Sequence, residues 1–285
     1  MVNDKMTFFD WVNIIFLTLF GITTLYPFLN MFFISISSMD EVMKSSGLML
    51  FPKNIQWDAY QYVFNYGGLT AAFKNTLFVT ITGTSLNLFM TCLGAYVVSD
   101  KRLPGRNFFM TMILITMFYG GGLIPGYIVM KSVKLVDTIW ALIIPQAIGA
   151  WYLILLRNFF MSVPESLKES ARIDGASEYR ILVKIMLPLS LPIIATLTLF
   201  YSVARWNVYS EAIIYISNAR LNPLQVAIRK MYDLSIMQVT DETPPPPVET
   251  VRSATVILST LPIILVYPFV QKYFIKGIIV GSVKG

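Results

Sequence analysis

The chain has 285 residues, of which 55% are apolar and only 13% are charged, and its mean hydropathy is +0.64. Soluble domains are closer to a quarter charged, so this composition indicates an integral membrane protein. There is no histidine and a single cysteine, Cys92, which excludes an internal disulfide, a His/Cys metal site and a histidine-dependent triad. The net charge of +6 fits lysines and arginines that anchor cytoplasmic loops better than it fits nucleic-acid binding.

Six apolar runs are long enough to cross a bilayer as helices, which takes roughly 20 residues each. They lie near 11–36, 73–98, 107–130, 138–160, 181–204 and 253–275. We therefore expect an all-α integral membrane protein in which residues 1–285 form a single transmembrane domain with six spans. Pro27 interrupts the first run and no clear small-residue cleavage site follows, so this run predicts a retained signal-anchor helix.

Two long connections separate these runs. The connection after Ser37 contains Pro52 and a short amphipathic piece over 57–64. The connection over 205–252 contains the tract Pro244–Pro247, a stiff extended segment that neither forms a helix nor spans a membrane. Within the third run, Gly120, Gly121, Gly122 and Pro125 predict a broken or kinked helix, which a translocation path tolerates.

Positive charges near the ends of the runs predict that both termini are cytoplasmic. The segments that this topology places inside carry Lys101, Arg102, Arg106, Arg157, Lys168, Arg172, Arg180, Lys184, Lys272, Lys276 and Lys284. Lys131 and Lys134, in a short outer turn, argue mildly against this arrangement. Six spans with both ends inside remain the best fit.

The segment over 161–180 has the pattern of a cytoplasmic docking element. Glu165, Lys168, Glu169 and Arg172 follow the i, i+3, i+4, i+7 spacing of one helix face, with opposite charges within reach of each other. Pro164 is suited to begin that helix and Gly175 to end it. An ordinary amphipathic loop on the membrane surface is the alternative interpretation.

The same segment resembles the EAA motif of permease subunits of bacterial ABC importers. That consensus is Glu-Ala-Ala, three residues, Gly, nine residues, Ile and then Leu-Pro; here Ser170 replaces the middle alanine. The matching residues are Glu169-Ser170-Ala171, Gly175, Ile185 and Leu187-Pro188. Further likeness to the carbohydrate-uptake branch lies in Asn158-Phe159-Phe160, Pro164-Glu165, Ile173-Asp174-Gly175-Ala176, Trp206-Asn207 and the tail from Gln271 to Gly285. Within that branch, the likeness is greatest to permeases for oligosaccharides, including products of polysaccharide breakdown.

The resemblance implies a type I ABC importer permease fold in the bacterial inner membrane. It implies a second, related permease subunit, two ATPase subunits that bind ATP and Mg, an external solute-binding protein and an oligosaccharide substrate. The sequence agrees with this division, because it has no Gly-Lys-Ser or Gly-Lys-Thr and so lacks a phosphate-binding loop of its own. We expect no enzyme activity and no cofactor on this chain.

The resemblance also implies roles for residues of the coupling segment, which would sit in a cleft of the ATPase and move as a lever. Glu169 would make a polar contact with the ATPase, Ala171 would allow close packing and Gly175 would form the turn. For Arg172 and Asp174, local pairing is the alternative interpretation. The complete set of expected coupling residues is Glu165, Glu169, Ala171, Arg172, Asp174 and Gly175.

Sugar sites combine aromatic faces with amide or carboxylate partners, and residues of these types lie in the middle or outer half of the expected spans. The candidates for the substrate path are Tyr119, Gln146, Trp151, Tyr152, Trp206, Asn207 and Glu211. For each aromatic, helix packing or an interfacial position is the alternative interpretation. Lys184 and Arg205 lie near the ends of runs, where their side chains are expected to reach the interface.

Two other functions remain open from the sequence. A secondary sugar transporter driven by an ion gradient would need buried ionisable relays, which the runs largely lack. An intramembrane enzyme would need a nucleophile with a base, or paired carboxylates, and without histidine few combinations remain. The permease subunit of an ATP-driven importer is the favoured interpretation.

Overall fold

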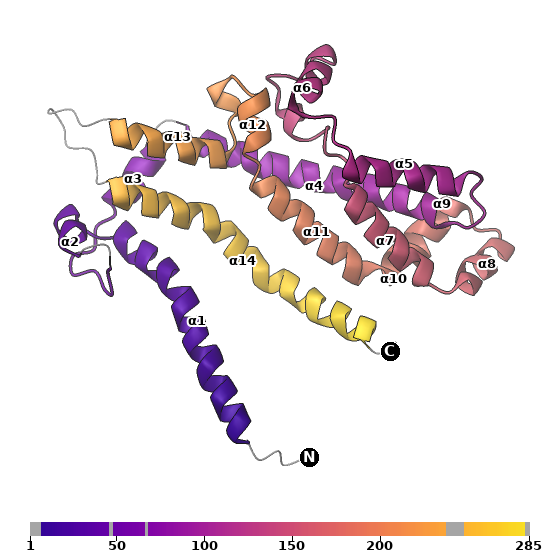
Figure 1. Ribbon diagram of the computed structural model, residues 1–285, viewed down its shortest axis with the longest axis horizontal. Coiled ribbons are helices and arrows are strands. Elements are labelled where there is room, and N and C mark those ends of the chain that lie inside the picture. Colours follow the sequence, from indigo (N-terminus) through magenta and orange to yellow (C-terminus); the bar gives the residue numbers. More distant parts are fainter. Residues whose placement is uncertain (1–6, 46–47, 66–67, 238–247, 283–285) are drawn as a thin grey trace. The chain divides into compact units, whose positions relative to one another are not determined.

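The computed structural model describes residues 7–45, 48–65, 68–237 and 248–282, and these residues form helices and no named strand (Figure 1). An isolated bridge pairs Ser37 with Ile55. For the described part of the chain, the all-α prediction is confirmed. Two compact units are present, residues 1–69 with 228–262, and residues 70–227 with 263–285.

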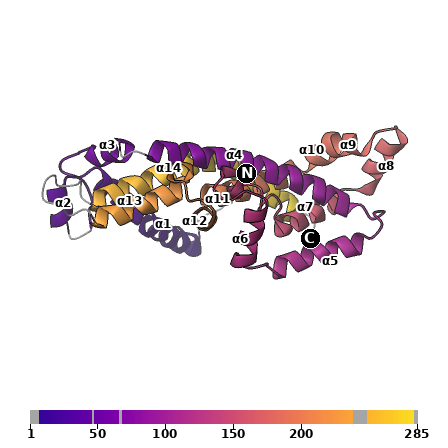
Figure 2. The same ribbon diagram turned by 90° about the horizontal axis from the view of Figure 1, so that it is seen from above.

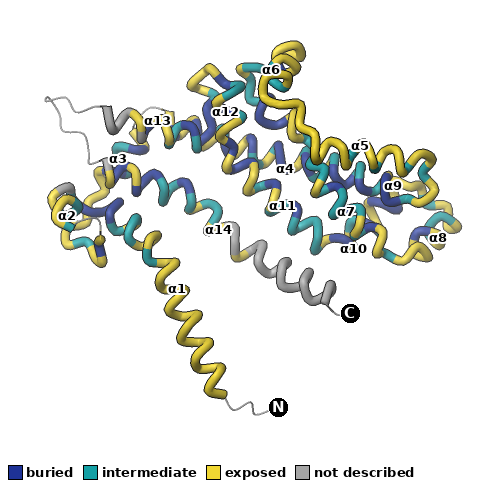
Figure 3. Tube along the Cα trace, viewed as in Figure 1, coloured by how far each residue is buried: buried dark blue, intermediate teal, exposed yellow. Residues whose placement is uncertain are grey.

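In the first unit, α1 (Phe8–Ser35) begins with a capping box. The Asp10 backbone N–H donates to Thr7 Oγ1 at 3.4 Å, and the Thr7 backbone N–H donates to Asp10 Oδ2 at 2.7 Å. This pairing satisfies backbone donors that no helical carbonyl reaches. The helix is apolar on all sides and remains exposed over most of its length (Figure 3). An apolar helix without a packed face is typical of a lipid-facing span.

The same unit holds two short helices, α2 (Met39–Lys44) and α3 (Asp58–Asn65). The second of these is the amphipathic piece predicted over 57–64. The hydroxyls of Ser35 and Tyr60 lie 2.8 Å apart, which fixes α3 to the end of α1.

Two further helices contribute to both units. These are α13 (Leu224–Met237) and α14 (Val248–Ser282). The proline tract Pro244–Pro247 lies outside the described residues, so its predicted extended form stays a prediction.

The second unit is organised around α4 (Leu69–Ser99), a helix of 31 residues. Helices α7 (Ala150–Ser162) and α11 (Leu191–Trp206) pack beside its second half, and α5 (Arg106–Phe118) packs on α7 (Figure 1). Their shared core consists of Cys92, Ala95, Val98, Leu153, Leu156, Phe160, Ile181, Leu182, Met186, Leu197 and Tyr201. We call these residues the first core.

A second core lies around the other half of α4. It joins Val79 of α4 to the 3₁₀ helix η1 (Ile139–Leu142) and to α12 (Ser210–Tyr215), with η3 (Ala219–Leu221) nearby in sequence. Leu142 and Ala212 are both almost fully buried there. This packing holds an irregular stretch of backbone against regular helices.

Two apolar segments are sharply bent. Helices α5 and α6 (Leu123–Ser132) meet at 115°, and the break lies at the predicted glycines, where Gly122 has a φ of +81°. The glycines weaken the helix and Pro125 falls in the first turn of α6, where its missing N–H is tolerated. The predicted break in the run over 107–130 is therefore confirmed.

The second bend, of 84°, lies at Ser190 between two proline-containing turns. On one side, α9 (Glu178–Ile181) continues through a π-helical turn, η2 (Leu182–Met186), into α10 (Leu187–Leu189). On the other side, α11 begins. Figure 2 shows α9 and α10 with α8 (Glu165–Ile173) at the same end of the unit as the end of α4.

Among the described residues, α1 and α4 are each long and apolar enough to cross a membrane, and the two bent pairs raise the number to four if each is one span. Six spans were predicted. The run over 138–160 differs most, because α7 has only 13 residues and begins at Ala150. Pro145 lacks a backbone N–H and disfavours a helical residue before it, so the chain there forms η1 and turns. The run over 253–275 lies within the 35-residue α14.

Candidate functional site

The ends of α8 are formed as the sequence predicts. Pro164 precedes the first helical residue, a place where a missing N–H is harmless. At the other end, the Gly175 N–H donates to the Arg172 carbonyl at 3.0 Å, and the Ala176 N–H donates to the Ala171 carbonyl at 2.9 Å. These two bonds form a Schellman motif, and Gly175 has the positive φ (+76°) that this motif requires. The helix is thus limited to nine residues and followed by a fixed reversal.

Helix α8 has two unlike faces. Lys168 is buried, and Ala171 and Arg172 are half-buried; Ala171 and Ala176 pack against the first core. Ser166, Glu169, Ser170 and Ile173 repeat at the i, i+3, i+4, i+7 spacing and are all exposed. Ile173 is 85% exposed, which is unusual for an isoleucine beside a packed core. We call these four residues the outer face of α8.

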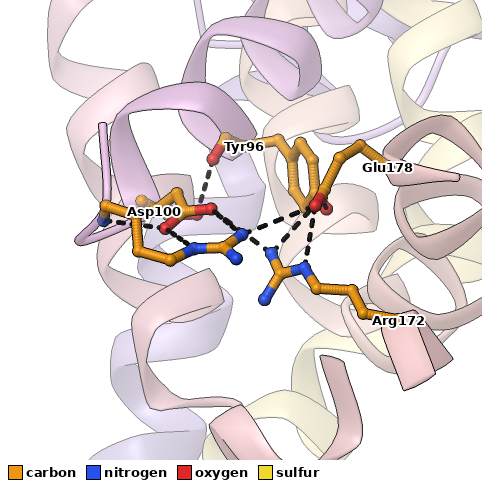
Figure 4. Close-up of polar contacts among 6 residues, drawn as sticks. Tyr96, Asp100, Arg172 and Glu178 are labelled. Atoms are coloured by element: carbon orange, nitrogen blue, oxygen red, sulfur yellow. Dashed lines mark hydrogen bonds and ion pairs between the residues drawn. The ribbon is translucent and has the colours of Figure 1, made fainter. Parts of the chain in front are cut away.

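Five side chains form a charged cluster beneath α8: Tyr96, Asp100, Arg102, Arg172 and Glu178 (Figure 4). Arg172 donates from Nε to Glu178 Oε1 at 2.8 Å and from Nη2 to Asp100 Oδ2 at 3.3 Å. Arg102 donates from Nη2 to the same Asp100 oxygen at 2.8 Å. The Tyr96 hydroxyl donates to Glu178 Oε2. The cluster therefore joins α8 to the end of α4 and to the start of α9.

The charges within the cluster balance, with two guanidinium groups facing two carboxylates. Hydrogen bonds from Arg102, followed by the attraction of both arginines, lower the pKa of Asp100 from 3.8 to about 2. The hydrogen bond to Glu178 raises the pKa of Arg172. Arg172 is the least exposed of the charged members, with 20% of its side chain exposed, against 28% for Asp100 and 53% for Glu178. Arg172 is thus the central connection of the cluster.

The structure places the expected coupling residues in three settings. Glu165 lies 3.8 Å from Lys101 Nζ as an exposed ion pair. Arg172 pairs locally within the charged cluster, and Ala171 packs inward against the first core. Glu169, Asp174 and Gly175 are exposed. Among the described residues, Glu165 and Arg172 pair with neighbouring segments, and no ion pair joins two charges of α8, because Lys168 and Arg172 turn toward the body of the unit.

Two expected substrate-path residues come together. Gln146 Nε2 donates to Glu211 Oε1 at 2.5 Å and joins the stretch before α7 to the first turn of α12. Gln146 is exposed and Glu211 is half-buried. An amide and a carboxylate with free lone pairs at this position have the chemistry to accept hydrogen bonds from hydroxyl groups.

The remaining path candidates have different settings. Tyr152 packs edge-on against Tyr201 with ring centroids 4.6 Å apart, and Trp206 is 5% exposed and packs against Phe73. Asn207 donates from Nδ2 to the Val203 carbonyl at 2.8 Å near the end of α11. These three have packing or capping partners. Tyr119 and Trp151 are exposed, at 83% and 62% respectively.

Arg205 contradicts the expectation that its side chain reaches the interface. It is 2% exposed and donates to Asn87 Oδ1 at 3.0 Å, and to the carbonyls of Leu142, Ile143 and Gln146 at 2.6, 3.2 and 2.7 Å. The cause is the irregular backbone around η1, which offers carbonyl groups that no helix satisfies. The guanidinium thus replaces the missing backbone donors and fixes the stretch that carries Gln146.

Sequence reasoning missed the partners of both arginines. A Cβ on Gly83 would lie 3.0 Å from Arg205 Nε, so glycine leaves room for the guanidinium beside α4, and Asn87 follows one turn later. A glycine and an amide at i, i+4 inside an apolar run could have indicated that a polar side chain packs against this part of α4. In the charged cluster, Arg172 and Glu178 are 6 residues apart, so the sequence spacing could have indicated their contact. Arg172 and Asp100 are 72 residues apart, and spacing gives no indication of theirs.

Comparison with known proteins agrees with this arrangement. Residues 67–280 match the family described as "Binding-protein-dependent transport system inner membrane component". The Polygalacturonan/rhamnogalacturonan transport system permease protein YtcP of Bacillus subtilis is 41% identical, and the alignment covers 99% of this chain and 100% of that protein. Protein LplC of the same organism is also 41% identical, over 97% of this chain and 95% of its own length. A crystal structure of a bacterial ABC transporter involved in the import of the acidic polysaccharide alginate aligns over 93% of this chain and 96% of its own, with a TM-score of 0.85 and 35% identity. The chain belongs to the family of inner-membrane components of binding-protein-dependent transport systems.

Proposed function

We propose that this chain is a permease subunit of an ATP-driven oligosaccharide importer, and that α8 is the element through which the ATPase moves it. The observation that carries the proposal is the outer face of α8, exposed on one side of a helix whose other side is fixed by the charged cluster and the first core. Family membership supports the general role.

The outer face has the composition of a docking surface. Burying a side chain of the size of Ile173 in a partner contributes ~1.5–3 kcal/mol, and Ile173 is 85% exposed in the free chain. Ser166 and Ser170 keep the surface small, and Glu169 offers a carboxylate for a polar contact. Ile173 thus joins Glu165, Glu169, Ala171, Arg172, Asp174 and Gly175 as a coupling residue; Ala171 and Arg172 act from the underside.

The charged cluster supplies the mechanical link. Movement of α8 by a closing ATPase pair would pull on Asp100 at the end of α4 and on Glu178 at the start of α9, because Arg172 bonds to both. The segment from α9 leads through the π turn and the 84° bend into α11. A displacement of α8 would therefore reach two helices of the first core at once.

The proposed assembly contains a second, related permease, two ATPase subunits that bind ATP and Mg, and an external solute-binding protein. In it, this chain spans the bacterial inner membrane six times, with both termini in the cytoplasm and α8 on the cytoplasmic side. The positive charges near α8 and the α4–α5 turn support this orientation.

For the substrate, we propose an oligosaccharide released from an acidic polysaccharide. The support comes from the relatives: the protein YtcP is named for polygalacturonan and rhamnogalacturonan transport, and the structural neighbour imports alginate. On this chain, Gln146 and Glu211 are the proposed hydroxyl-binding pair, with the exposed Tyr119 and Trp151 as candidate ring contacts. Tyr152, Trp206 and Asn207 would shape the path by packing.

The test is uptake into proteoliposomes by the complex that co-purifies with this chain. Labelled oligosaccharides from polygalacturonan and, as neutral controls, oligosaccharides of similar length are supplied with the solute-binding protein outside and ATP inside. We expect uptake of the acidic series that requires both ATP and the binding protein. Uptake by this chain alone, driven by an ion gradient, would refute the proposal and favour a secondary transporter.

A further inference from the structure

A small polar cavity lies beside the start of α8, apart from the charged cluster. Its volume is about 200 Å³, and it is lined by Ser99, Lys101, Met161, Ser162, Val163, Pro164, Glu165 and Lys168. These residues come from the end of α4, the turn that follows it, the end of α7 and the first turn of α8. The cavity shares Glu165 with the proposed coupling residues, but the outer face of α8 and the substrate path do not line it.

Lys168 is the unusual member of the lining. It is only 7% exposed, yet its side chain makes no hydrogen bond and no ion pair with any residue of the described chain. Most of this side chain is enclosed, and among the described residues no carboxylate pairs with its ammonium at the cavity. An anion in the cavity that Lys168 lines would supply the missing partner.

The surroundings favour an anion further. Helix α8 begins at this cavity with no side-chain cap, so its first backbone N–H groups and its dipole add positive potential. Lys101 contributes a second ammonium, and Glu165 offsets one of the two positive charges through its exposed pair at 3.8 Å. The Arg106 guanidinium contacts the cavity residue Met161, with Nη2 at 3.2 Å from its sulfur.

A fourth cation lies close by. Arg157 is one helical turn before Met161 on α7, and its Nε is buried without a hydrogen-bond partner among the described residues. The four cations Lys101, Arg106, Arg157 and Lys168 thus gather where the apolar helices end, with Glu165 as the carboxylate among the lining residues.

We propose that this cavity binds a phosphate group, and that its source is the headgroup of an anionic phospholipid. The lipid source is favoured by α5, which begins at Arg106 and exposes Phe108 and Phe109 beside the cations, at 63% and 47%. An exposed apolar helix next to a basic cavity accommodates both acyl chains and a charged headgroup. In the orientation proposed above, this is the cytoplasmic leaflet, and the bound lipid would brace the start of α8.

The experiment counts lipids retained by the intact complex that contains this chain. The complex is purified in detergent, incubated with equal amounts of phosphatidylglycerol and phosphatidylcholine of identical acyl chains, and analysed by native mass spectrometry. Lys168→Gln and Lys101→Gln each remove one cation from the cavity, and Lys184→Gln is the matched control on an exposed lysine of the same side. Glu165→Gln removes the competing carboxylate.

We expect the parent complex to prefer phosphatidylglycerol and each cavity lysine variant to lose about fivefold in apparent affinity, as for one lysine at an anionic surface. The control should retain the preference and Glu165→Gln should increase it, a gain that misfolding does not produce.

Thermal stabilisation by inorganic phosphate in a phosphatidylcholine-only sample, lost in Lys168→Gln, would support the phosphate site with a soluble source. Equal retention of both lipids with no response to phosphate would overturn the proposal. So would release of the ATPase subunits by Lys168→Gln with phosphatidylglycerol still bound, because a protein group would then be the partner of Lys168.

Discussion

Removing the guanidinium of Arg172 should uncouple ATP hydrolysis from transport. Arg172→Gln keeps a side chain of moderate length on α8 but loses the charge and the bonds to Glu178 at 2.8 and 3.4 Å and to Asp100 at 3.3 Å. Ala171 and Ala176 would still hold α8 against the first core, so the helix should persist. What is lost is the polar connection to α4 and α9.

The magnitude follows from the geometry and exposure of these bonds. Charge-assisted hydrogen bonds contribute about 1.5–3 kcal/mol when buried, whereas exposed ion pairs contribute ~0–1 kcal/mol. With Arg172 20% exposed and Glu178 53% exposed, the cluster lies between these limits. We expect a loss of about 1–2 kcal/mol, which raises the population of detached α8 by roughly 5- to 30-fold.

The assay is the ratio of oligosaccharide transported to ATP hydrolysed in proteoliposomes, measured with saturating binding protein. Arg172→Gln should lower this ratio while the ATPase subunits still co-purify, and the charge exchange Arg172→Glu with Glu178→Arg should restore part of it. Arg180→Gln is the control, an exposed arginine in the same segment. A normal ratio in Arg172→Gln with an intact complex would refute the role of the charged cluster as the mechanical link.

Three further outcomes follow from the geometry. A Cβ on Gly175 would meet open space, but the residue has a φ of +76°, so Gly175→Ala should destabilise the turn by ~1–2 kcal/mol and lower the ratio of oligosaccharide transported to ATP hydrolysed. Gly175→Asn should have a smaller effect, because asparagine tolerates this φ. Equal effects of the two variants would contradict the argument from backbone strain. Arg205→Met leaves several buried carbonyls without donors and should lower the free energy of unfolding by about 3–5 kcal/mol. The measurement is the thermal unfolding temperature in detergent, which should fall. Gly83→Val should lower this temperature by less, because the added side chain only crowds the Arg205 guanidinium. The Asp100 pKa is depressed in the folded chain, so its stabilisation should be complete above pH 4 and disappear as the pH falls from 3.8 toward 2. Comparison of unfolding temperatures between the parent and Asp100→Asn checks this, and a difference that already fades near pH 6 would contradict it.

The sequence predicted features that depend on local backbone chemistry. Pro164 and Gly175 set the ends of α8, and the glycines at 120–122 mark the break between α5 and α6. These predictions succeeded because proline and glycine act on the residues next to them, whatever the rest of the chain does.

Features that depend on distant contacts were not predicted. Apolarity favoured a helix over 138–160, but Pro145 stops it, and the freed carbonyls then draw Arg205 inward across 59–63 residues of sequence. The outward position expected for Arg205 followed from its place near the end of a run, which says nothing about carbonyls supplied by another segment. Lys168 was likewise expected to pair along α8, but its burial beside the end of α7 is a tertiary effect.

The two arginines solve different physical problems, and the difference bears on how the chain is driven. Arg172 is paired with carboxylates at a partly exposed site, where water can replace broken bonds, so its contacts are able to rearrange as α8 moves. Arg205 is enclosed by neutral carbonyls and an amide, where a broken bond leaves an unsatisfied group in a dry environment. A guanidinium also keeps its proton throughout the physiological range, so Arg205 cannot act as the proton relay that a gradient-driven carrier needs. An adjustable contact at α8 and a permanent one beside Gln146 together suit a permease that is moved through α8.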